Sequence, residues 1–510
     1  MIHLPRADVL IVGGGLMGAT AARLLREQAP SARIAMVDAG APIGTTPGVH
    51  LHDIADPAIW GQYNTRVRSG IQGMYTGAEV VREVPDAIDA VAPGMFHTLA
   101  FGEEAEAMPA TAIAWNAGGM GVHWTAATPW PAGSEVFADD EEWDEDLAAA
   151  QRVFGVRAPS IGPTALGIRV LEVLDARFGA AAPDDRRPQA MPMAVRRGAD
   201  GTLLRTSPST IFPPIADGSD DAFALATGAL VTSLIVEEGR VSGARVRDIR
   251  DGAETEGRAD TVLVCADALR TPQLLYASGI RPESLGRYLN EHAFIASRAL
   301  LDLGRFRLTL DDLPTAQPGE FCTDSLWIPH NGPRQPFHGQ VMNVTYVDDD
   351  GHAIAHSVGV SLYTPVESRP ENRVIFSDTE HDLAGMPRMR IEFAYSDADR
   401  ALIDRALVVA QETAEAFGAI DPATELAHLA PGSSLHLTGT VRSGAEDDGT
   451  SVCDPDGRVW GIEGLYLAGT GVVPTAVVAN ATLTGAITAV RAARAIAQRL
   501  APDHLRKGTP

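Results

Sequence analysis

A strand, a glycine-rich turn and a helix are predicted at the start of the chain, and they constrain its fold more than any other feature. An apolar run over residues 7–12 leads into the alanine-rich stretch 19–28, which favours a helix. A second apolar run, residues 33–37, closes on Asp38. This order predicts a βαβ unit, and with it an α/β fold on a parallel sheet of the Rossmann type.

The turn between the first strand and the helix has the spacing of a dinucleotide-binding loop. Gly13, Gly15 and Gly18 match G-x-G-x-x-G, and Asp38 follows the last of them by 20 residues. The glycines permit the tight turn and bring the helix N-terminus against a pyrophosphate, while the carboxylate can accept the hydroxyls of an adenosine ribose. We therefore predict that these four residues bind a dinucleotide, and the spacing alone leaves NAD and FAD open.

Segments much later in the chain return to the same sheet. Residues 229–236 and 243–247 read as strands, and residues 261–266 as a further buried strand. Near the end of the chain, residues 464–471 read as a strand ending in glycines, followed by a long alanine-rich helix over residues 482–500. A Rossmann core that is closed this late in the chain is the layout of FAD-binding oxidoreductases, so the pattern favours FAD.

These segments divide the chain into two predicted domains. Residues 1–297 and 431–510 are assigned to an FAD-binding domain of the Rossmann type that is split in sequence. Residues 298–430 mix apolar β-rich stretches with turns rich in Pro and Asp, and we assign them to a substrate-binding domain. The predicted fold class is thus α/β, or α+β with a Rossmann core.

The charge of the chain limits the kind of partner that it can bind. Its 66 Asp and Glu residues outnumber its 41 Lys and Arg residues, which gives a net charge of -25. Nucleic acids and anionic membranes require a basic patch that releases counterions. We therefore expect neither as a partner, and we expect a neutral small-molecule substrate.

The cysteines and the apolar segments favour a cytoplasmic location. The chain has three cysteines and no C-x-x-C spacing, which argues against a disulfide framework or a structural zinc and favours buried free thiols. The first eight residues leave no room for the apolar region of a signal peptide. The late apolar segment 472–497 contains Pro474, Asn480 and several arginines, so we do not expect it to cross a membrane.

A glycine-rich loop over residues 116–129 is a candidate ligand contact. Its glycines allow positive φ and close approach to a flat ligand, and the residues after them supply an imidazole, an aromatic wall and a hydroxyl. A buried turn with core aromatics is the alternative. The residues concerned are Gly118, Gly119, Gly121, His123, Trp124 and Thr125.

Two other motifs have simpler interpretations. The run 50–53, His-Leu-His-Asp, contains metal-binding residue types, but no third ligand pattern accompanies it, so we expect a surface loop and no metal. The acidic stretch 138–146 is expected to be a solvated helix start.

Several segments resemble one enzyme family. Residues 267–280 resemble the second signature of glucose-methanol-choline (GMC) oxidoreductases, although Asp267 stands where that signature usually has a glycine. Residues 286–292 are similar to the segment that follows the signature in the family.

More narrowly, the chain resembles the pyranose oxidase branch of that family. Residues 118–125 are similar to the loop that carries the flavin-attachment histidine, and residues 431–440 and 473–484 resemble the active-site blocks. The chain is shorter than fungal pyranose 2-oxidases, and in this it is similar to the bacterial members of the branch, which include C-glycoside 3-oxidases. The resemblance runs from the first predicted strand to the last helix.

The resemblance implies a catalytic pair. It places His436 on the catalytic histidine of the family and Asn480 on its partner. Oxidation of a secondary alcohol removes a proton from oxygen and a hydride from carbon, and an imidazole, with an unperturbed pKa of about 6.5, suits the role of base. An amide opposite the base can hold the same oxygen. From the residues alone, a histidine flanked by leucines is more commonly a core residue.

The resemblance also implies the flavin contacts. His123 falls on the position of covalent attachment in fungal members, and we expect it near FAD but more often without the bond. Thr125 is expected near flavin N5 and O4. Gln340 is similarly a candidate for binding sugar hydroxyls, with a solvent-facing loop residue as its alternative. Further expected FAD contacts are Gly118, Gly119, Met120, Trp124, Val231, Gly469, Gly471 and Thr482.

Together these implications predict FAD-dependent oxidation of a ring hydroxyl, at C2 or C3, of a free pyranose or of a sugar attached to an aglycone. The electrons would pass to O2 or to a quinone. Two alternatives stay open: a dehydrogenase of a non-sugar alcohol within the same family, and a flavin-binding protein that has lost catalysis and binds a partner. The carbon oxidised, the acceptor and the oligomeric state do not follow from the sequence.

Overall fold

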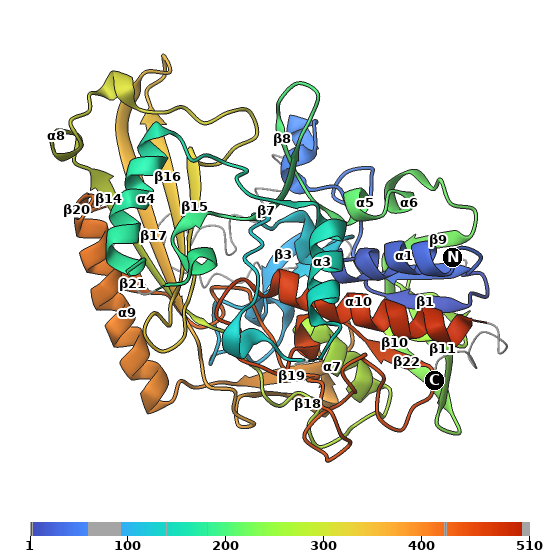
Figure 1. Ribbon diagram of the computed structural model, residues 1–510. Coiled ribbons are helices and arrows are strands. Elements are labelled where there is room, and N and C mark those ends of the chain that lie inside the picture. The colour runs from blue at the N-terminus through green and yellow to red at the C-terminus, as the bar shows by residue number, and fades with distance from the viewer. Residues whose placement is uncertain are drawn as a thin grey trace.

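A five-stranded parallel sheet forms the core of one half of the protein, on the right in Figure 1. The computed structural model describes residue 2 and residues 4–59, 93–138, 140–180, 182–422, 424 and 426–501. The strand order is β22-β13-β1-β2-β9, and each neighbouring pair is parallel. The strands are β1 (Val9–Val12), β2 (Ile34–Asp38), β9 (Phe223–Thr227), β13 (Val262–Val264) and β22 (Leu465–Leu467). The Rossmann-type core predicted from strands far apart in the sequence is therefore confirmed.

Helices from the two ends of the chain pack together against this sheet. Helix α1 (Leu16–Gln28) and helix α10 (Ala481–Leu500) lie side by side (Figure 1), and both were predicted from their alanine-rich sequences. Their apolar side chains join one core with strand residues such as Ile11 and Leu263. Because alanine has a small side chain and a high helix propensity, these helices can approach each other and the sheet closely.

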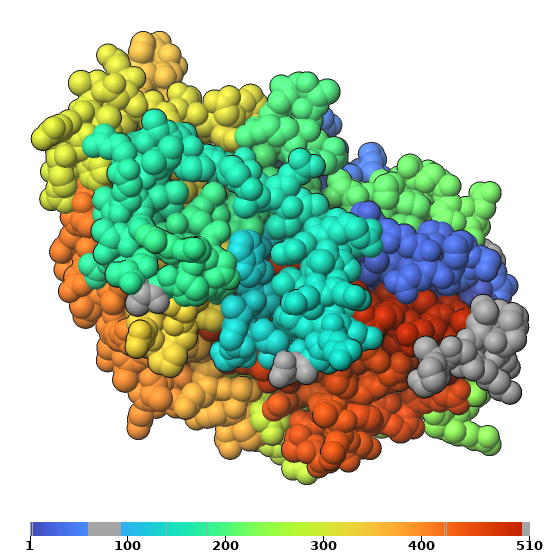
Figure 2. All heavy atoms as spheres, viewed as in Figure 1, coloured from blue at the N-terminus to red at the C-terminus, as the bar shows by residue number. Residues whose placement is uncertain are grey.

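Helix α3 (Trp143–Phe154) covers α10 from the outside. In Figure 2 the cyan segment that includes α3 lies over the red helix α10. The contact includes charge: Arg491, with only 2% of its side chain exposed, pairs with Asp140 at 2.7 Å and with the buried Asp146 at 2.8 Å. Arg494 pairs with Asp146 as well. The acidic stretch expected to be solvated is thus partly buried, because it neutralises arginines of α10.

A second sheet, of seven strands, forms the β-rich part of the protein. Its main path is β20-β14-β17-β16-β15-β6, β21 pairs with β14, and the recorded pairs are antiparallel. Its strands are β6 (Gln189–Ala190), β14 (Ala293–Leu301), β15 (Asp324–Ile328), β16 (His338–Val347), β17 (Ala353–Thr364), β20 (Gly418–Ile420) and β21 (Ala427–His428).

Two helices cover one face of the seven-stranded sheet, and the other face turns toward the Rossmann core. Helix α4 (Ala165–Phe178) and helix α9 (Asp397–Glu415) share a core with sheet residues that include Val341 (Figure 1). Since side chains alternate along a strand, Gln340 and Met342 point to the opposite face, and Met342 packs against the core of the Rossmann part. The face that carries Gln340 is therefore the one next to the dinucleotide-binding half.

The division into domains at residues 297 and 430 stays a prediction. Several helices and strands cross these boundaries or pack across them. Strand β14 runs across residue 298, and both α4 and β6 join the β-rich core from the segment before it. Conversely, the hairpin of β18 (Arg373–His381) and β19 (Pro387–Glu392) packs on α7 (Asp267–Ala277) of the Rossmann half. The β-rich part is thus built from more than one stretch of chain.

The remaining elements are short sheets, hairpins and helices. They are β3 (Gly94–His97), β4 (Ala112–Trp115), β5 (Val156–Arg157), β7 (Met193–Arg197), β8 (Leu203–Arg205), β10 (Ala229–Glu237), β11 (Arg240–Asp248), β12 (Glu254–Arg258), α5 (Pro208–Ile211), α6 (Pro214–Asp217) and α8 (Leu303–Phe306).

The cysteines and helices can be compared with two sequence expectations. Cys265, Cys322 and Cys453 all lie in the described part of the chain and are buried and free, as predicted. Within the described ranges, none of the helices combines the length and apolar character that crossing a bilayer requires.

We predict that Arg491→Met destabilises the protein by about 3 kcal/mol, because breaking a buried ion pair leaves an uncompensated charge. Asp146 keeps Arg494 as a partner, so the loss should lie at the lower end of the usual range for buried pairs. Urea unfolding followed by circular dichroism measures the change. Arg499→Met is the matched control on the same helix, because Arg499 pairs with an exposed carboxylate, Glu463, and such pairs contribute less than about 1 kcal/mol. Equal losses in the two variants would contradict the prediction.

Candidate active site

A cavity opens where the central parallel strands end. Its lining includes Val12 and Val37, the last or nearly last residues of β1 and β2, and Cys265, just after β13. Ligands of doubly wound sheets bind beyond the carboxyl ends of the strands. Predicted site residues that line the cavity are Gly13, Gly15, Asp38, Gly119, Met120, Trp124, Val231, His436, Gly469 and Thr482.

The glycine loop has the shape that a pyrophosphate requires. Gly13 has a φ of +103°, which favours glycine, and a Cβ on Gly18 would lie 2.0 Å from the carbonyl oxygen of Gly13. Gly18 is outside the cavity lining, and its role is the close packing of α1 on β1. Helix α1 begins after Gly15, which has no side chain to cap the first turn. The N-terminal N–H groups and the helix dipole therefore fit a bound anion.

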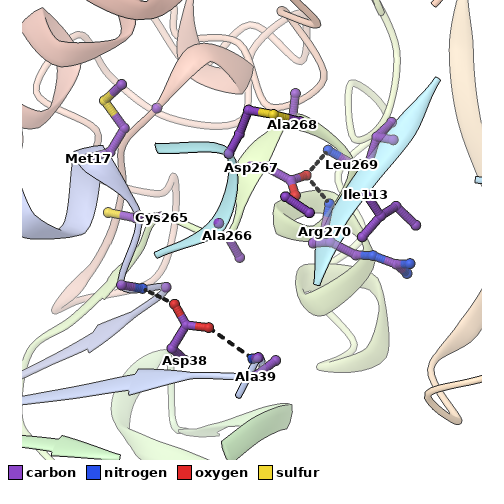
Figure 3. A pocket seen from close by; sticks show the side chains of 18 of the residues that line it. Met17, Asp38, Ala39, Ile113, Cys265, Ala266, Asp267, Ala268, Leu269 and Arg270 are labelled. Atoms are coloured by element: carbon purple, nitrogen blue, oxygen red, sulfur yellow. Dashed lines mark hydrogen bonds between the residues drawn. The ribbon is translucent and has the colours of Figure 1, made fainter. Parts of the chain in front are cut away.

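Asp38 ties three loops together beneath the cavity. Its Oδ2 accepts hydrogen bonds from the N–H groups of Gly14, at 3.0 Å, and Gly118, at 3.1 Å, and its Oδ1 accepts one from Gly40 at 2.9 Å. Figure 3 shows Asp38 at the end of its strand beside the pocket. Burial raises the pKa of this carboxyl, and the three N–H groups oppose that shift. Contact between Asp38 and a ribose stays a prediction.

Asp267 stands where the second family signature usually has a glycine, and its backbone conformation explains why either residue can occur there. Its φ is +74°, the left-handed region in which glycine is favoured and Asp is tolerated. Its Oδ1 accepts hydrogen bonds from the N–H groups of Leu269 and Arg270, at 2.7 and 2.9 Å (Figure 3). The carboxylate thus satisfies the first turn of α7, which offsets the strained backbone.

The loop predicted to face the flavin divides into residues that line the cavity and residues behind them. Trp124 lines it and is fixed from two sides: its Nε1 donates to the carbonyl of Thr206 at 2.7 Å, and its own carbonyl lies 2.9 Å from Nε2 of His50. His50 is buried and holds this loop, rather than lying in an open surface loop. Among the described residues, no group of three or more His, Cys, Asp or Glu side chains is placed to hold a metal ion.

His123 lies behind the cavity lining. Its Nε2 is 2.8 Å from Oδ1 of Asn116, and Asn116 itself lines the cavity. Burial lowers the pKa of His123 to about 3, so the ring is neutral. Among the described residues, the lining also lacks the predicted site residues Gly118, Thr125, Gln340, Gly471 and Asn480, and Thr125 is exposed.

His436 lines the cavity and contacts Asn480, which precedes the lining residues Ala481 and Thr482 but lies outside the lining itself; the catalytic roles that the resemblance implies for this pair stay a prediction. Nδ2 of Asn480 lies 3.3 Å from Nε2 of His436, and an amide nitrogen can only donate, so this Nε2 carries the lone pair of a base. The proton then sits on Nδ1, which is 2.8 Å from Nε2 of His292. Desolvation by the surrounding protein lowers the pKa of His436 to about 4.

Gln340 lies beside this pair and holds its amide. Its Nε2 donates to Oδ1 of Asn480 at 2.6 Å. The same sheet face carries His338, whose backbone pairs with Tyr363, and the Tyr363 ring packs against His292 with centroids 4.6 Å apart. The face of the β-rich sheet that turns toward the Rossmann part therefore completes the site.

Glu291 anchors the loop that carries His436. Its carboxylate accepts hydrogen bonds from the N–H of Gly432 and from the N–H and hydroxyl of Ser434. Leu435, directly before His436, has a φ of +59°, a costly conformation for a leucine that persists where the surroundings enforce it. Burial raises the pKa of Glu291 to about 7 against these hydrogen bonds.

Sequence reasoning did not single out Glu291, His292 or His338 as site residues. The first two lie in the segment 286–292, which resembles the family segment that follows the second signature. That resemblance was the available signal. His338 lies two residues before Gln340, on the same strand face.

Sequence comparisons identify the family of the chain. Residues 210–294 and 368–489 match sequence models of the GMC oxidoreductase family. A C-glycoside 3-oxidase from Microbacterium trichothecenolyticum is 40% identical, over 98% of each chain. A second C-glycoside 3-oxidase, from Arthrobacter globiformis, is 37% identical, over 97% of this chain and 95% of the relative. A pyranose 2-oxidase from Tricholoma matsutake is 26% identical, over 97% and 94%.

Solved structures share the fold over nearly the whole length. A formate oxidase from Aspergillus oryzae superposes with a TM-score of 0.68 at 14% identity, covering 98% of this chain and 99% of the other. Pyridoxine 4-oxidase from Mesorbium loti superposes with a TM-score of 0.64 at 18% identity, covering 96% and 99%. With the split Rossmann core and its glycine cradle, these findings confirm the predicted family and cofactor: the chain belongs to the GMC oxidoreductase family, enzymes that use FAD.

Proposed function

We propose that the protein oxidises a secondary ring hydroxyl of a pyranose to the keto-sugar, with C3 of a glycoside as the preferred position. The observation that carries the proposal is the pairing of His436 with Asn480 at the edge of the cavity. The position is taken from the names of the relatives at 40% and 37% identity, both C-glycoside 3-oxidases, while the pyranose 2-oxidase is more distant.

The residues of the chain divide the chemistry between them. His436, neutral and with its lone pair on Nε2, accepts the hydroxyl proton of the substrate. Nδ2 of Asn480 donates to the same oxygen and orients the carbon beneath it. The glycine loop, Asp38 and the Trp124 loop would hold FAD, which would supply the acceptor for the hydride and the route for the electrons to O2 or a quinone. Gln340 keeps the Asn480 amide in its donating orientation.

The neutral polar groups of this site suit a neutral polyhydroxyl substrate. Gln340 and Asn480 are uncharged, and the histidines next to them, His292 and His338, have pKa values lowered by burial. The net charge of -25 also disfavours an anionic substrate. A sugar or glycoside fits both conditions.

Anaerobic bleaching of the flavin tests the substrate class. We expect C-glycosides, O-glycosides and glucose to bleach the wild type, and NMR of the products to show a 3-keto group. His436→Ala should slow bleaching by roughly 10²–10⁴-fold, which is the usual contribution of a general base. His352→Ala, which changes an exposed histidine, is the control. Bleaching by non-sugar alcohols alone would contradict the proposed sugar substrate and favour a dehydrogenase of another alcohol. If no alcohol bleached the flavin, a flavin-binding module without catalysis would be favoured.

The pH dependence follows from the pKa of His436. Burial disfavours the imidazolium, so the folded-state pKa of about 4 lies below the ordinary value, and the neutral base persists at every pH above it. We expect kcat/KM to be level from about pH 5.5 to 7.5 and to fall tenfold per pH unit below about pH 4. Rapid-mixing measurements at each pH, with the sample returned to pH 7 to check recovery, give the profile. An inflection near pH 6.5 would contradict it.

We further propose that FAD is bound without a covalent link. His123 lies behind the cavity lining, and its Nε2 is engaged by Asn116. Acid precipitation should therefore release all the yellow colour into the supernatant. Colour that stays with the precipitate, and a flavin peptide containing His123 in mass spectra, would show the bond.

A further inference from the structure

The segment that carries Asn480 is largely buried, and a single side chain accepts two of its backbone N–H groups. Residues 473–480, all of them described, form neither helix nor strand after the short turn at 470–472. Buried backbone N–H groups of such a segment require acceptors from elsewhere. The N–H groups of Val478 and Ala479 both donate to Oε1 of Glu135, at 2.7 and 2.8 Å.

Glu135 is itself fixed by burial and by further hydrogen bonds. Its side chain is fully buried, and its Oε2 lies 2.6 Å from Nε2 of His330 and accepts the N–H of Ala132 at 3.1 Å. The guanidinium of Arg186 donates to the carbonyl of His330 through two nitrogens. Burial raises the pKa of Glu135, but His330 and the backbone N–H groups outweigh it and lower the pKa below its usual value. The carboxylate is therefore ionised and has four donors.

The fixed backbone lies one residue from the amide that the reaction needs. Asn480 occupies the N-cap position of α10, where an Asn side chain commonly bonds to the first turn. Here the side chain reaches Gln340 and His436 instead. Its direction is thus set by the backbone of Val478 and Ala479 and not by the helix.

We propose that Glu135 is a positioning residue for the Asn480 amide. By holding two successive N–H groups on a single oxygen, Glu135 fixes the segment before Asn480, so that the amide faces His436. His330 and Arg186 orient the carboxylate. The inference rests on the proposed function of the His436–Asn480 pair, and it predicts that what matters at residue 135 is the place of one acceptor oxygen rather than the charge.

Two variants separate the acceptor from the charge. Glu135→Gln keeps a carbonyl oxygen at the position of Oε1 and loses the charge. Glu135→Asp keeps the charge and withdraws both oxygens by one methylene. We expect Glu135→Gln to retain kcat for flavin reduction within about threefold. We expect Glu135→Asp to lower kcat about 100-fold with KM changed less than threefold, because displacement of a catalytic group by about 1 Å can cost that much.

A buried carboxylate outside the site provides the matched control. Asp324 in β15 accepts hydrogen bonds from Thr164, Thr323 and Asn343, and it touches neither His436 nor Asn480. Asp324→Glu and Asp324→Asn should lower the melting temperature without lowering kcat. A fall in kcat for these variants that matches Glu135→Asp would overturn the inference, as would equal kcat values for the Gln and Asp variants at residue 135.

Crystal structures of both Glu135 variants provide a readout that does not depend on turnover. The distance between Asn480 Nδ2 and His436 Nε2, 3.3 Å in the wild type, should be kept in Glu135→Gln and should lengthen in Glu135→Asp. An unchanged distance in both would overturn the inference. A wild type that no sugar or other alcohol reduces would instead overturn the proposed function, and these structures would still decide the role of Glu135.

Discussion

Parallel pairing of β13 with β1 on one side and β22 on the other is the constraint on which the rest of the structure depends. Its registers, Leu10 with Val262 and Val262 with Leu465, align the ends of strands that come from the start, middle and end of the chain. Because parallel strands end at the same edge, the glycine loop after β1, the start of α7 and the segment leading to Asn480 all converge there. The position of the cavity, and the approach to it of the segment that leads to Asn480, therefore follow from one ladder of backbone hydrogen bonds.

The two residues that we propose as catalytic, His436 and Asn480, are not themselves held by that ladder. Each lies at the end of an irregular loop, and a buried glutamate accepts backbone N–H groups just before it: Glu291 before His436 and Glu135 before Asn480. Loops give side chains directions that helices and strands cannot provide, but their backbone polar groups must be satisfied when they are buried. A carboxylate has several lone pairs, so one compact side chain can accept hydrogen bonds from several N–H groups of the loop. These hydrogen bonds also restrict the conformation of the loop.

The parts of the protein that could be predicted from the sequence are those whose cause is local. The dinucleotide-binding turn could be predicted from the spacing of Gly13, Gly15 and Gly18. The last helix could be predicted from its alanine-rich composition. His436 is different, because a histidine between leucines resembles a core residue, and only a resemblance to a family separated the two interpretations. Glu135 could not be found, since its partners lie 195 and 343 residues away. The burial of Asp146, at the end of an acidic stretch that is otherwise mostly exposed, could not be predicted for the same reason, because the arginines that pair with it belong to α10.

The contact between Glu135 and His330 crosses from the Rossmann half of the protein to the β-rich half. Recombination between homologous enzymes is a common route to new substrate range, and the insert that forms the β-rich part is the obvious unit to exchange. A chimera made at the sequence boundaries whose insert lacks a histidine at the position of His330 would leave the buried Glu135 carboxylate without one of its hydrogen-bond partners. The two halves therefore depend on each other at this contact, and residues 132–136 would have to be exchanged together with the insert.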